Sequence, residues 1–72
     1  MTGGTLVTAV IDLNSISGDG TTRVRPANLS GPVQPGDDVI VHETEDDISG
    51  CGTIMRTSDN AVHITVDRQS LR

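Results

Sequence analysis

The sequence predicts an all-β protein: a single small domain over residues 1–72, folded as a five-stranded barrel or a strongly twisted antiparallel sheet. Three stretches after residue 36 alternate apolar and polar residues with a period of two, which is typical of strands with one wet face. Clusters of Gly, Pro, Asn, Asp and Ser separate the apolar stretches, and such clusters usually end short strands. No stretch shows the periodicity of a helix of ordinary length.

The predicted core has to be aliphatic, because the 72 residues include no Phe, Tyr or Trp. A chain of this size buries only about 60% of the surface that its unfolded form exposes. Small domains usually add disulfides, metal or oligomerisation to compensate, but the one cysteine, Cys51, can form no internal disulfide. We therefore expect a reducing compartment and keep self-association open.

The chain carries ten acidic and five basic residues, for a net charge of −5. An acidic surface repels phosphate backbones and anionic membranes, so nucleic acid and membranes are disfavoured as partners. Residues 1–10 lack the pattern of a signal peptide, and no run approaches the roughly 20 apolar residues of a membrane span. We expect a cytoplasmic protein. All five basic residues are arginines, which favours a bacterial or phage source.

The first two strands are predicted at Thr5–Leu13 and Thr21–Arg25, after a flexible start at residues 1–4. β-Branched residues favour strands in both stretches, and Asp19-Gly20 between them is a hairpin signal. Val24 is expected to point inward. Exposed charges on this hairpin could pair with one another: Asp12, Arg23 and Arg25.

Residues 26–36 are predicted to be irregular, because three prolines each remove a backbone donor. Pro35-Gly36 has the composition of a type II turn, with Gly at the position that needs positive φ. Leu29 and Val33 are expected to close one end of the core. Residues 26–33 could also cover the outer face of the strands that follow.

The last three strands are predicted at Val39–Glu43, Ser49–Thr57 and Ala61–Asp67, joined by loops at 44–47 and 58–60. Register has to keep inward residues opposite inward residues. The loop lengths then pair Val41 with Gly50, Ile40 with Cys51, Ile54 with Ile64, and Met55 with His63. Glycines at 50 and 52 would leave room inside the sheet, or let the strand bend sharply.

The runs G-D-D-V-I-V at 36–41, G-C-G-T-I at 50–54 and V-H-I-T-V-D at 62–67 resemble the core of SH3-like barrels, in particular the KOW and Tudor-type small barrels. The resemblance covers about residues 36–71. It implies a small barrel that binds nucleic acid, peptides or proteins and belongs to a class that seldom catalyses a reaction. The chain departs from the nucleic-acid-binding members by lacking exposed aromatic and basic residues, and from the Tudor-type readers by lacking their aromatic cage.

Three residue types suited to zinc, His42, Cys51 and His63, fall on the outer face of adjacent predicted strands. The register separates them, because Met55, the predicted partner of His63, lies about 13 Å from Cys51 along its strand. We therefore expect no metal site and no other cofactor. Cys51 has no evident base or oxyanion hole, so a partly buried structural cysteine is expected and an enzyme is not.

Two surfaces remain as candidate interaction sites. The first is an acidic cluster that is a solvated loop, a recognition loop for a basic partner or a weak cation-binding loop, made by Glu43, Glu45, Asp46 and Asp47. The second is an outer face where apolar residues should cluster beside His63, namely Ile40, Cys51 and Met55. Unless residues 26–33 cover it, this face is available to a twin subunit or to another protein.

These observations favour a non-enzymatic protein–protein interaction or assembly module, as in a bacterial or phage accessory protein. The alternative is a nucleic-acid-associated module of the KOW type that would use Arg23, Arg25 and Arg56. In a variant of that alternative, the acidic surface imitates nucleic acid and occupies a basic protein.

Overall fold

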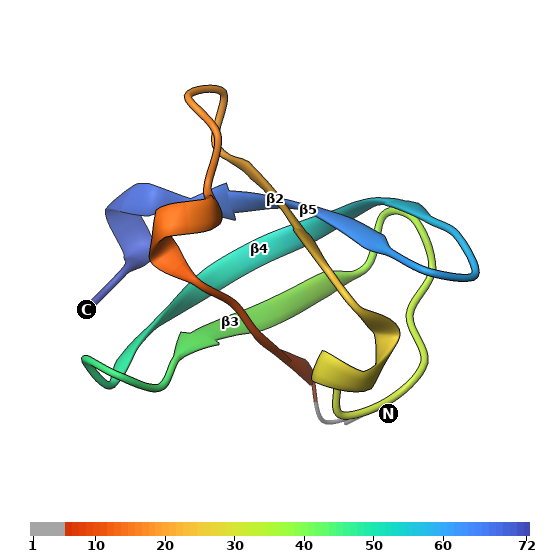
Figure 1. Cartoon of the computed structure of the whole chain (residues 1–72), viewed down its shortest axis with the longest axis horizontal. Coiled ribbons are helices and arrows are strands. Elements are labelled where there is room, and N and C mark those ends of the chain that lie inside the picture. Colours follow the sequence, from red (N-terminus) through yellow and green to blue (C-terminus); the bar gives the residue numbers. More distant parts are fainter. Residues whose placement is uncertain (1–5) are drawn as a thin grey trace, which may run out of the picture.

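The computed structural model describes residues 6–72, so the prediction of a flexible start at residues 1–4 lies outside the described residues. Five strands form one strongly curled sheet, which confirms the all-β prediction (Figure 1). The strands are β1 (Val7–Val10), β2 (Thr21–Val24), β3 (Asp38–Glu43), β4 (Ile48–Thr57) and β5 (Val62–Asp67). Three short 3-10 turns join or follow them: η1 (Leu13–Ser15), η2 (Pro26–Asn28) and η3 (Arg68–Ser70).

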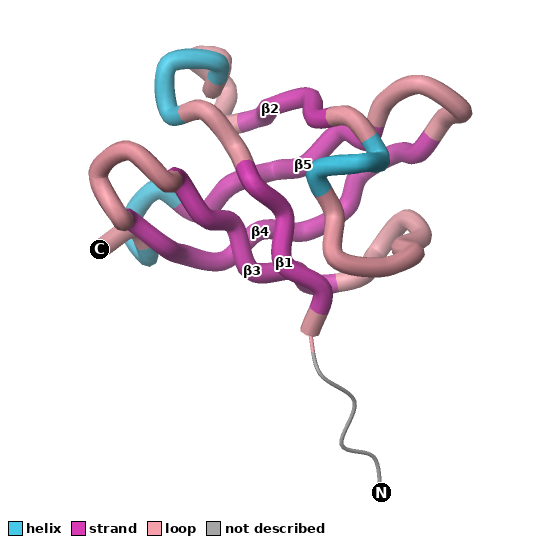
Figure 2. The backbone as a smooth tube through the Cα atoms, turned by 60° about the horizontal axis from the view of Figure 1, so that its bottom comes forward, coloured by secondary structure: helices cyan, strands magenta, loops and turns pink. Residues whose placement is uncertain are grey.

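The strand order in the sheet is β1-β3-β4-β5-β2 (Figure 2). β3, β4 and β5 form an antiparallel meander, and β2 is antiparallel to β5. β1 runs parallel to β3, so the sheet is mixed and the expectation of a purely antiparallel one is corrected. The two edge strands, β1 and β2, are not paired with each other, and the sheet is a curled half-barrel.

The predicted hairpin between the first two strands is wrong. β1 ends at Val10, and the Asp12 carboxylate accepts a hydrogen bond from the Asn14 amide at 2.9 Å, which starts η1 and redirects the chain. Because that carboxylate caps η1, the predicted ion pair of Asp12 with Arg23 or Arg25 does not form. The turn at Asp19-Gly20 does form, with φ of +87° at Gly20, but it only leads into β2.

The core lies on the concave side of the sheet. The period-two pattern of the sequence predicted correctly which side chains of the last three strands are buried there. Alternate residues of β3, β4 and β5 are buried, and β1 and β2 add fewer. Leu29 and Val33 pack against this core from its open end, as predicted. Gly36 has φ of +93°, as the predicted turn at Pro35-Gly36 requires. The buried apolar side chains are Ala9, Ile11, Val24, Val39, Val41, Ile54, Val62, Ile64 and Val66.

Gly52 lies in close contact with both neighbouring strands. A Cβ atom there would approach Ile64 Cγ2 to 2.8 Å, the Thr65 carbonyl oxygen to 3.0 Å and Val41 Cγ1 to 3.1 Å. A Cβ atom at Gly50 would instead meet the end of the chain, where Leu71 packs against the core and its Cδ2 atom would lie at 2.8 Å. The room that the sequence predicts at these glycines is therefore taken up by neighbouring strands and by the end of the chain.

The register between β3 and β4 is the predicted one, with Ile40 opposite Cys51 and Val41 opposite Gly50. Between β4 and β5, Ile54 faces Ile64 as predicted, but His63 faces Arg56 rather than Met55. The register shifts between Ile54 and Arg56, which marks a β-bulge. A bulge sets two residues of one strand opposite one of its neighbour, so Met55 and Arg56 both lie beside His63.

Candidate functional site

The outer face of the sheet is exposed where β3 and β4 meet. Ile40 and Cys51 are cross-strand partners, and both are exposed. Residues 26–33 do not cover them, because Leu29 and Val33 pack against the core from the open end of the half-barrel. The expectation that Cys51 is partly buried is therefore corrected.

β1 extends this apolar surface. Its parallel pairing sets Thr8 beside Ile40 and Val10 beside His42, so Leu6 and Val10 flank Ile40 on the same side of the sheet. Leu6 is 50% exposed and Val10 is 39% exposed. Leu6, Val10, Ile40 and Cys51 thus lie together on the outer face. Sequence reasoning missed the contribution of β1, although apolar residues on both faces of that strand were the signal for it.

Met55 lies farther along β4 and is the most exposed of the large apolar residues described, at 54%. The bulge places it next to Arg56, whose guanidinium group donates to His63 Nε2 at 3.5 Å. A shallow hollow of about 360 Å³ lies here, and Asp19 lines it together with Met55, Arg56 and His63. The Thr21 hydroxyl and the Thr21 amide donate to the Asp19 carboxylate at 2.7 and 3.1 Å and lower its pKa.

A second shallow hollow, of about 410 Å³, opens on the outer face beside Cys51. Leu6 forms one wall, and Thr53 and Thr65, which face each other across β4 and β5, contribute another. Two carboxylates rim it: Asp38 and Asp67. The hollow is therefore apolar at its base and acidic at its edge.

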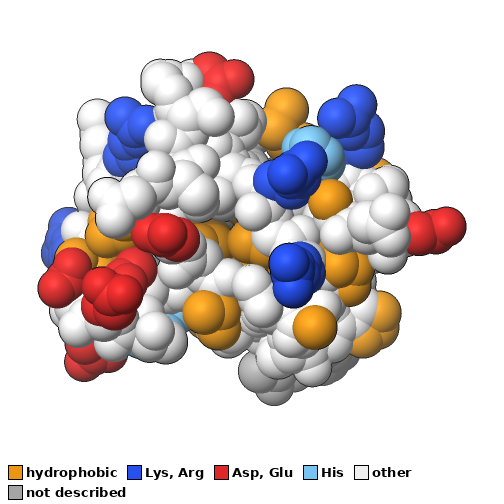
Figure 3. All heavy atoms as spheres, viewed as in Figure 1, with side chains coloured by type: hydrophobic (Ala, Val, Ile, Leu, Met, Phe, Trp, Pro, Cys, Tyr) orange, Lys and Arg blue, Asp and Glu red, His pale blue; other side chains and the backbone are white. Residues whose placement is uncertain are grey.

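The acidic hairpin between β3 and β4 is built around Glu43. This carboxylate is only 7% exposed and accepts hydrogen bonds from the backbone amides of Glu45 and Asp46 at 3.1 and 2.7 Å. Its two acceptor oxygens thus hold the loop, whereas Glu45, Asp46 and Asp47 stay exposed. Figure 3 shows acidic side chains gathered at the end of the molecule where this hairpin lies.

The three residues of types suited to zinc have separate environments. His42 Nδ1 lies 2.7 Å from the Ser49 hydroxyl, and His42 Nε2 lies 3.8 Å from Asp47. His63 contacts Arg56, and Cys51 lies between Ile40 and Asp67 in the sheet. Within residues 6–72 no group of three His, Cys, Asp or Glu side chains is arranged to hold a metal ion.

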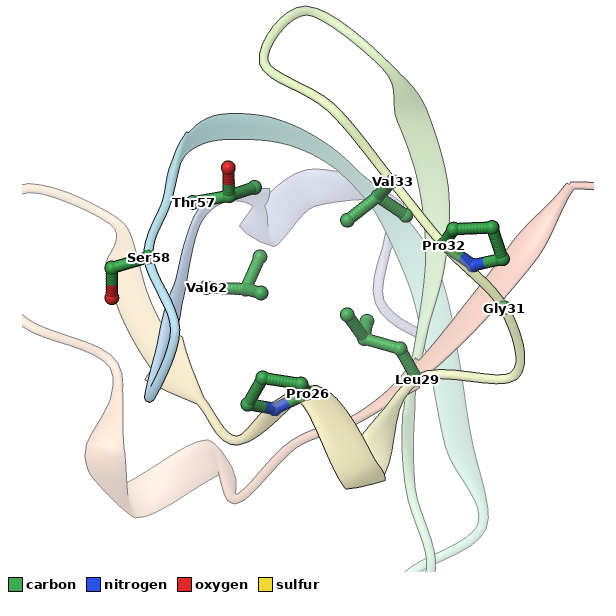
Figure 4. A pocket seen from close by; sticks show the side chains of 8 residues that line it. All are labelled: Pro26, Leu29, Gly31, Pro32, Val33, Thr57, Ser58 and Val62. Atoms are coloured by element: carbon green, nitrogen blue, oxygen red, sulfur yellow. The ribbon is translucent and has the colours of Figure 1, made fainter.

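The open end of the half-barrel carries a further hollow of about 420 Å³. Figure 4 shows Leu29, Val33 and Val62 pointing into it, with Pro26 at its lower edge. Among the described residues that line this hollow, only Thr57 and Ser58 carry side-chain hydroxyls and none is charged. Such a lining can accept an apolar group but supplies no acid or base.

Comparisons with protein-family models, with curated proteins and with solved structures find no match to this chain. In the part of the chain that the structure covers, no helix is both long and apolar enough to cross a membrane.

Proposed function

We propose that this protein is a non-enzymatic interaction or assembly module, and that the outer face of its curled sheet is the binding surface. The observation that carries the proposal is the exposure of large apolar side chains on neighbouring strands. A chain without aromatic residues has few large apolar groups, yet it leaves several in solvent. Clustered exposed apolar residues commonly mark surfaces that another protein covers. Leu6, Val10 and Ile40 lie together on this face, and Met55 lies farther along it on β4.

The charges around this face extend the proposed surface. His63 and Arg56 border Met55 on one side, and the acidic hairpin with Glu45, Asp46 and Asp47 lies at the other end of the β3–β4 pair. Charged rims around an apolar centre give specificity and speed association. We infer that Glu43 supports this hairpin from within and does not touch the partner.

We further propose that the fold is an SH3-like small β-barrel left open between β1 and β2. The β3-β4-β5 meander over residues 38–67 supports this assignment, since it carries the three motifs of the resemblance. Modules of this kind would fit a cytoplasmic accessory protein of a bacterium or phage. An affinity capture from the source cells tests the function when wild type is compared with the paired variant Ile40→Asp and Met55→Asp.

We expect wild type to retain one or a few proteins that the paired variant loses. A variant with two added acidic groups away from the outer face, Asn60→Asp and Gln34→Asp, serves as the matched control and should retain them. If the paired variant captured the same proteins as wild type, the outer face would not be the binding surface.

The second candidate function is binding to nucleic acid. One observation favours it: Arg23, Arg25 and Arg56 have no carboxylate within 4.0 Å among the described residues, although acids outnumber bases two to one. The net charge of −5 and the absence of aromatic side chains for stacking weigh against it. Binding of a single-stranded oligonucleotide that weakens steeply with salt would support this candidate, and no binding even at low salt would exclude it.

A further inference from the structure

The outer face is polarised along β4 and β5. At one end lie Cys51 and its cross-strand partner Asp67, beside the 410 Å³ hollow. In the middle Thr53 faces Thr65, and at the other end lie Met55, Arg56 and His63. The face thus has a hollow with a negative rim at one end and a projecting apolar side chain with a positive neighbour at the other. The Thr53–Thr65 pair forms the wall of the hollow that faces the Met55 end.

A two-fold axis would make such a face complementary to itself. If the axis lies in the plane of the contact and crosses the strands at the Thr53–Thr65 pair, β4 of one copy runs antiparallel over β4 of the other. The end with Met55 and Arg56 then lies over the hollow and Asp67 of the second copy, and the contact occurs twice. Isologous contacts of this kind are the commonest way in which soluble proteins form homo-oligomers.

We propose that a second copy of this chain occupies the outer face, with Met55 inserted in the partner's hollow and Arg56 paired with the partner's Asp67. The inference rests on the proposed function, because it names the partner of the same surface. Shape supports it, since Met55 is 54% exposed and the hollow next to Cys51 combines an apolar wall at Leu6 with the short side chains of Thr53 and Thr65. A flexible thioether side chain adapts readily to an irregular hollow.

Within residues 6–72, the charges that this arrangement brings together have no ion-pair partner. No carboxylate among residues 6–72 lies within 4.0 Å of the Arg56 guanidinium group. The Asp67 carboxylate accepts one hydrogen bond, from the Gln69 amide at 3.1 Å, and keeps acceptor capacity toward solvent. Asp19, which lines the same hollow as Arg56, accepts two hydrogen bonds from Thr21.

The dimer should be weak. The outer face is the convex side of a curled sheet, so contact is confined to β4, β5 and the Leu6 and Asp38 side of the hollow, and the buried area stays small. Interfaces at the low end of the size range belong to transient complexes. The net charge of −5 on each copy adds long-range repulsion, which salt screens beyond about 8 Å at physiological ionic strength. We therefore expect a dissociation constant of the dimer above about 1 μM at physiological salt.

A pair of charge reversals tests the arrangement by sedimentation equilibrium of the full chain. Arg56→Glu sets two acids against each other in a homodimer, and Asp67→Arg sets two arginines against each other. We expect each variant alone to weaken self-association by about tenfold or more. An equimolar mixture restores both opposite-charge contacts, so it should form a heterodimer at least as readily as wild type dimerises.

Matched controls separate contact from overall charge. Arg25→Glu and Asp59→Arg change the net charge by the same amounts as the two test variants, but both lie away from the Thr53–Thr65 pair. Alone and mixed, they should associate within about threefold of wild type. Because Asp67 also caps η3, Asp67→Asn, which keeps a side-chain acceptor, is a second variant that should weaken dimerisation without loss of the fold.

The proposal is overturned if wild type stays monomeric at millimolar concentration, if the controls weaken association as much as the test variants, or if the mixture shows no heterodimer. A monomeric wild type that still captures another protein through Ile40 and Met55 would refute the second copy and leave the proposed function standing. Binding of an oligonucleotide lost in Arg56→Glu, with no dimer at any concentration, would likewise assign the basic end to nucleic acid and refute the dimer.

Discussion

Replacing Gly52 by alanine should destabilise the protein although it adds only one methyl group. The added Cβ would lie 2.8 Å from Ile64 Cγ2, 3.1 Å from Val41 Cγ1 and 3.0 Å from the Thr65 carbonyl oxygen. Both side chains are fully buried, at 0% exposure, and the third contact is backbone, so none of the neighbours can move alone. Overpacking of this kind costs about 1–3 kcal/mol.

Alanine also removes the entropic cost of a glycine inside a strand, about 0.5–1 kcal/mol. At the middle of both ranges, the net loss of unfolding free energy is about 1.3 kcal/mol. In a domain of this length each 1 kcal/mol shifts Tm by roughly 4–8 °C, so we expect a fall of about 5–10 °C. Far-UV circular dichroism is the suitable probe, because the chain has no Trp or Tyr to report by fluorescence.

Gly18→Ala is the matched control, since a Cβ atom at Gly18 meets nothing within 4 Å. It should leave Tm unchanged or raise it slightly by restricting the unfolded chain. If Gly52→Ala unfolded at the same temperature as wild type, β4 would not approach β3 and β5 as closely as the curled sheet requires. The account of how the outer face is curved would then fail.

Three further outcomes follow from particular contacts. Glu43→Gln should cost about 1–2 kcal/mol and speed hydrogen exchange at the Glu45 and Asp46 amides, because a neutral amide accepts their hydrogen bonds less strongly; unchanged exchange would contradict this. The lowered pKa of Asp19 means that its stabilisation is present above the ordinary value of 3.8 and is lost as the pH falls through the folded-state pKa. In Asp19→Asn, the urea concentration at the unfolding midpoint should therefore change less with pH in this acid range than in wild type. The same slope of midpoint against pH in both proteins would exclude the effect. Exposed Cys51 should react with a thiol reagent in native buffer nearly as fast as in denaturant; protection in dilute monomer would place it inside.

Local periodicity was enough to predict which side chains of the last three strands are buried. The period of two depends only on each strand being extended, so Val62, Ile64 and Val66 could be placed without knowing their neighbours. The same rule would have placed Glu43 inside, since it continues the parity of Val39 and Val41. Its position in a run of acidic residues instead indicated a side chain exposed to solvent. The buried site is tolerated because loop amides satisfy the carboxylate.

The partner of the first strand could not be predicted in this way. Asp19-Gly20 does form a turn, and a turn between two strand-like stretches favours a hairpin. The ten residues between Val10 and Thr21, however, include the Asp12-capped η1, which leads the chain away before β2 begins. Pairing is then decided by which open edges the β3-β4-β5 meander offers. β1 takes the edge of β3 and β2 takes the edge of β5.

The β-bulge in β4, which the sequence did not predict, connects the fold with the proposed interface. Without the bulge, strict alternation along β4 would turn Arg56 to the inner face, where an unpaired guanidinium group could not remain. The bulge keeps Ile54 inside and brings both Met55 and Arg56 to the outside beside His63. The same register shift therefore protects the core and creates an exposed apolar side chain with a positive neighbour. A sequence change that removed the bulge would have to alter the core and the outer face together.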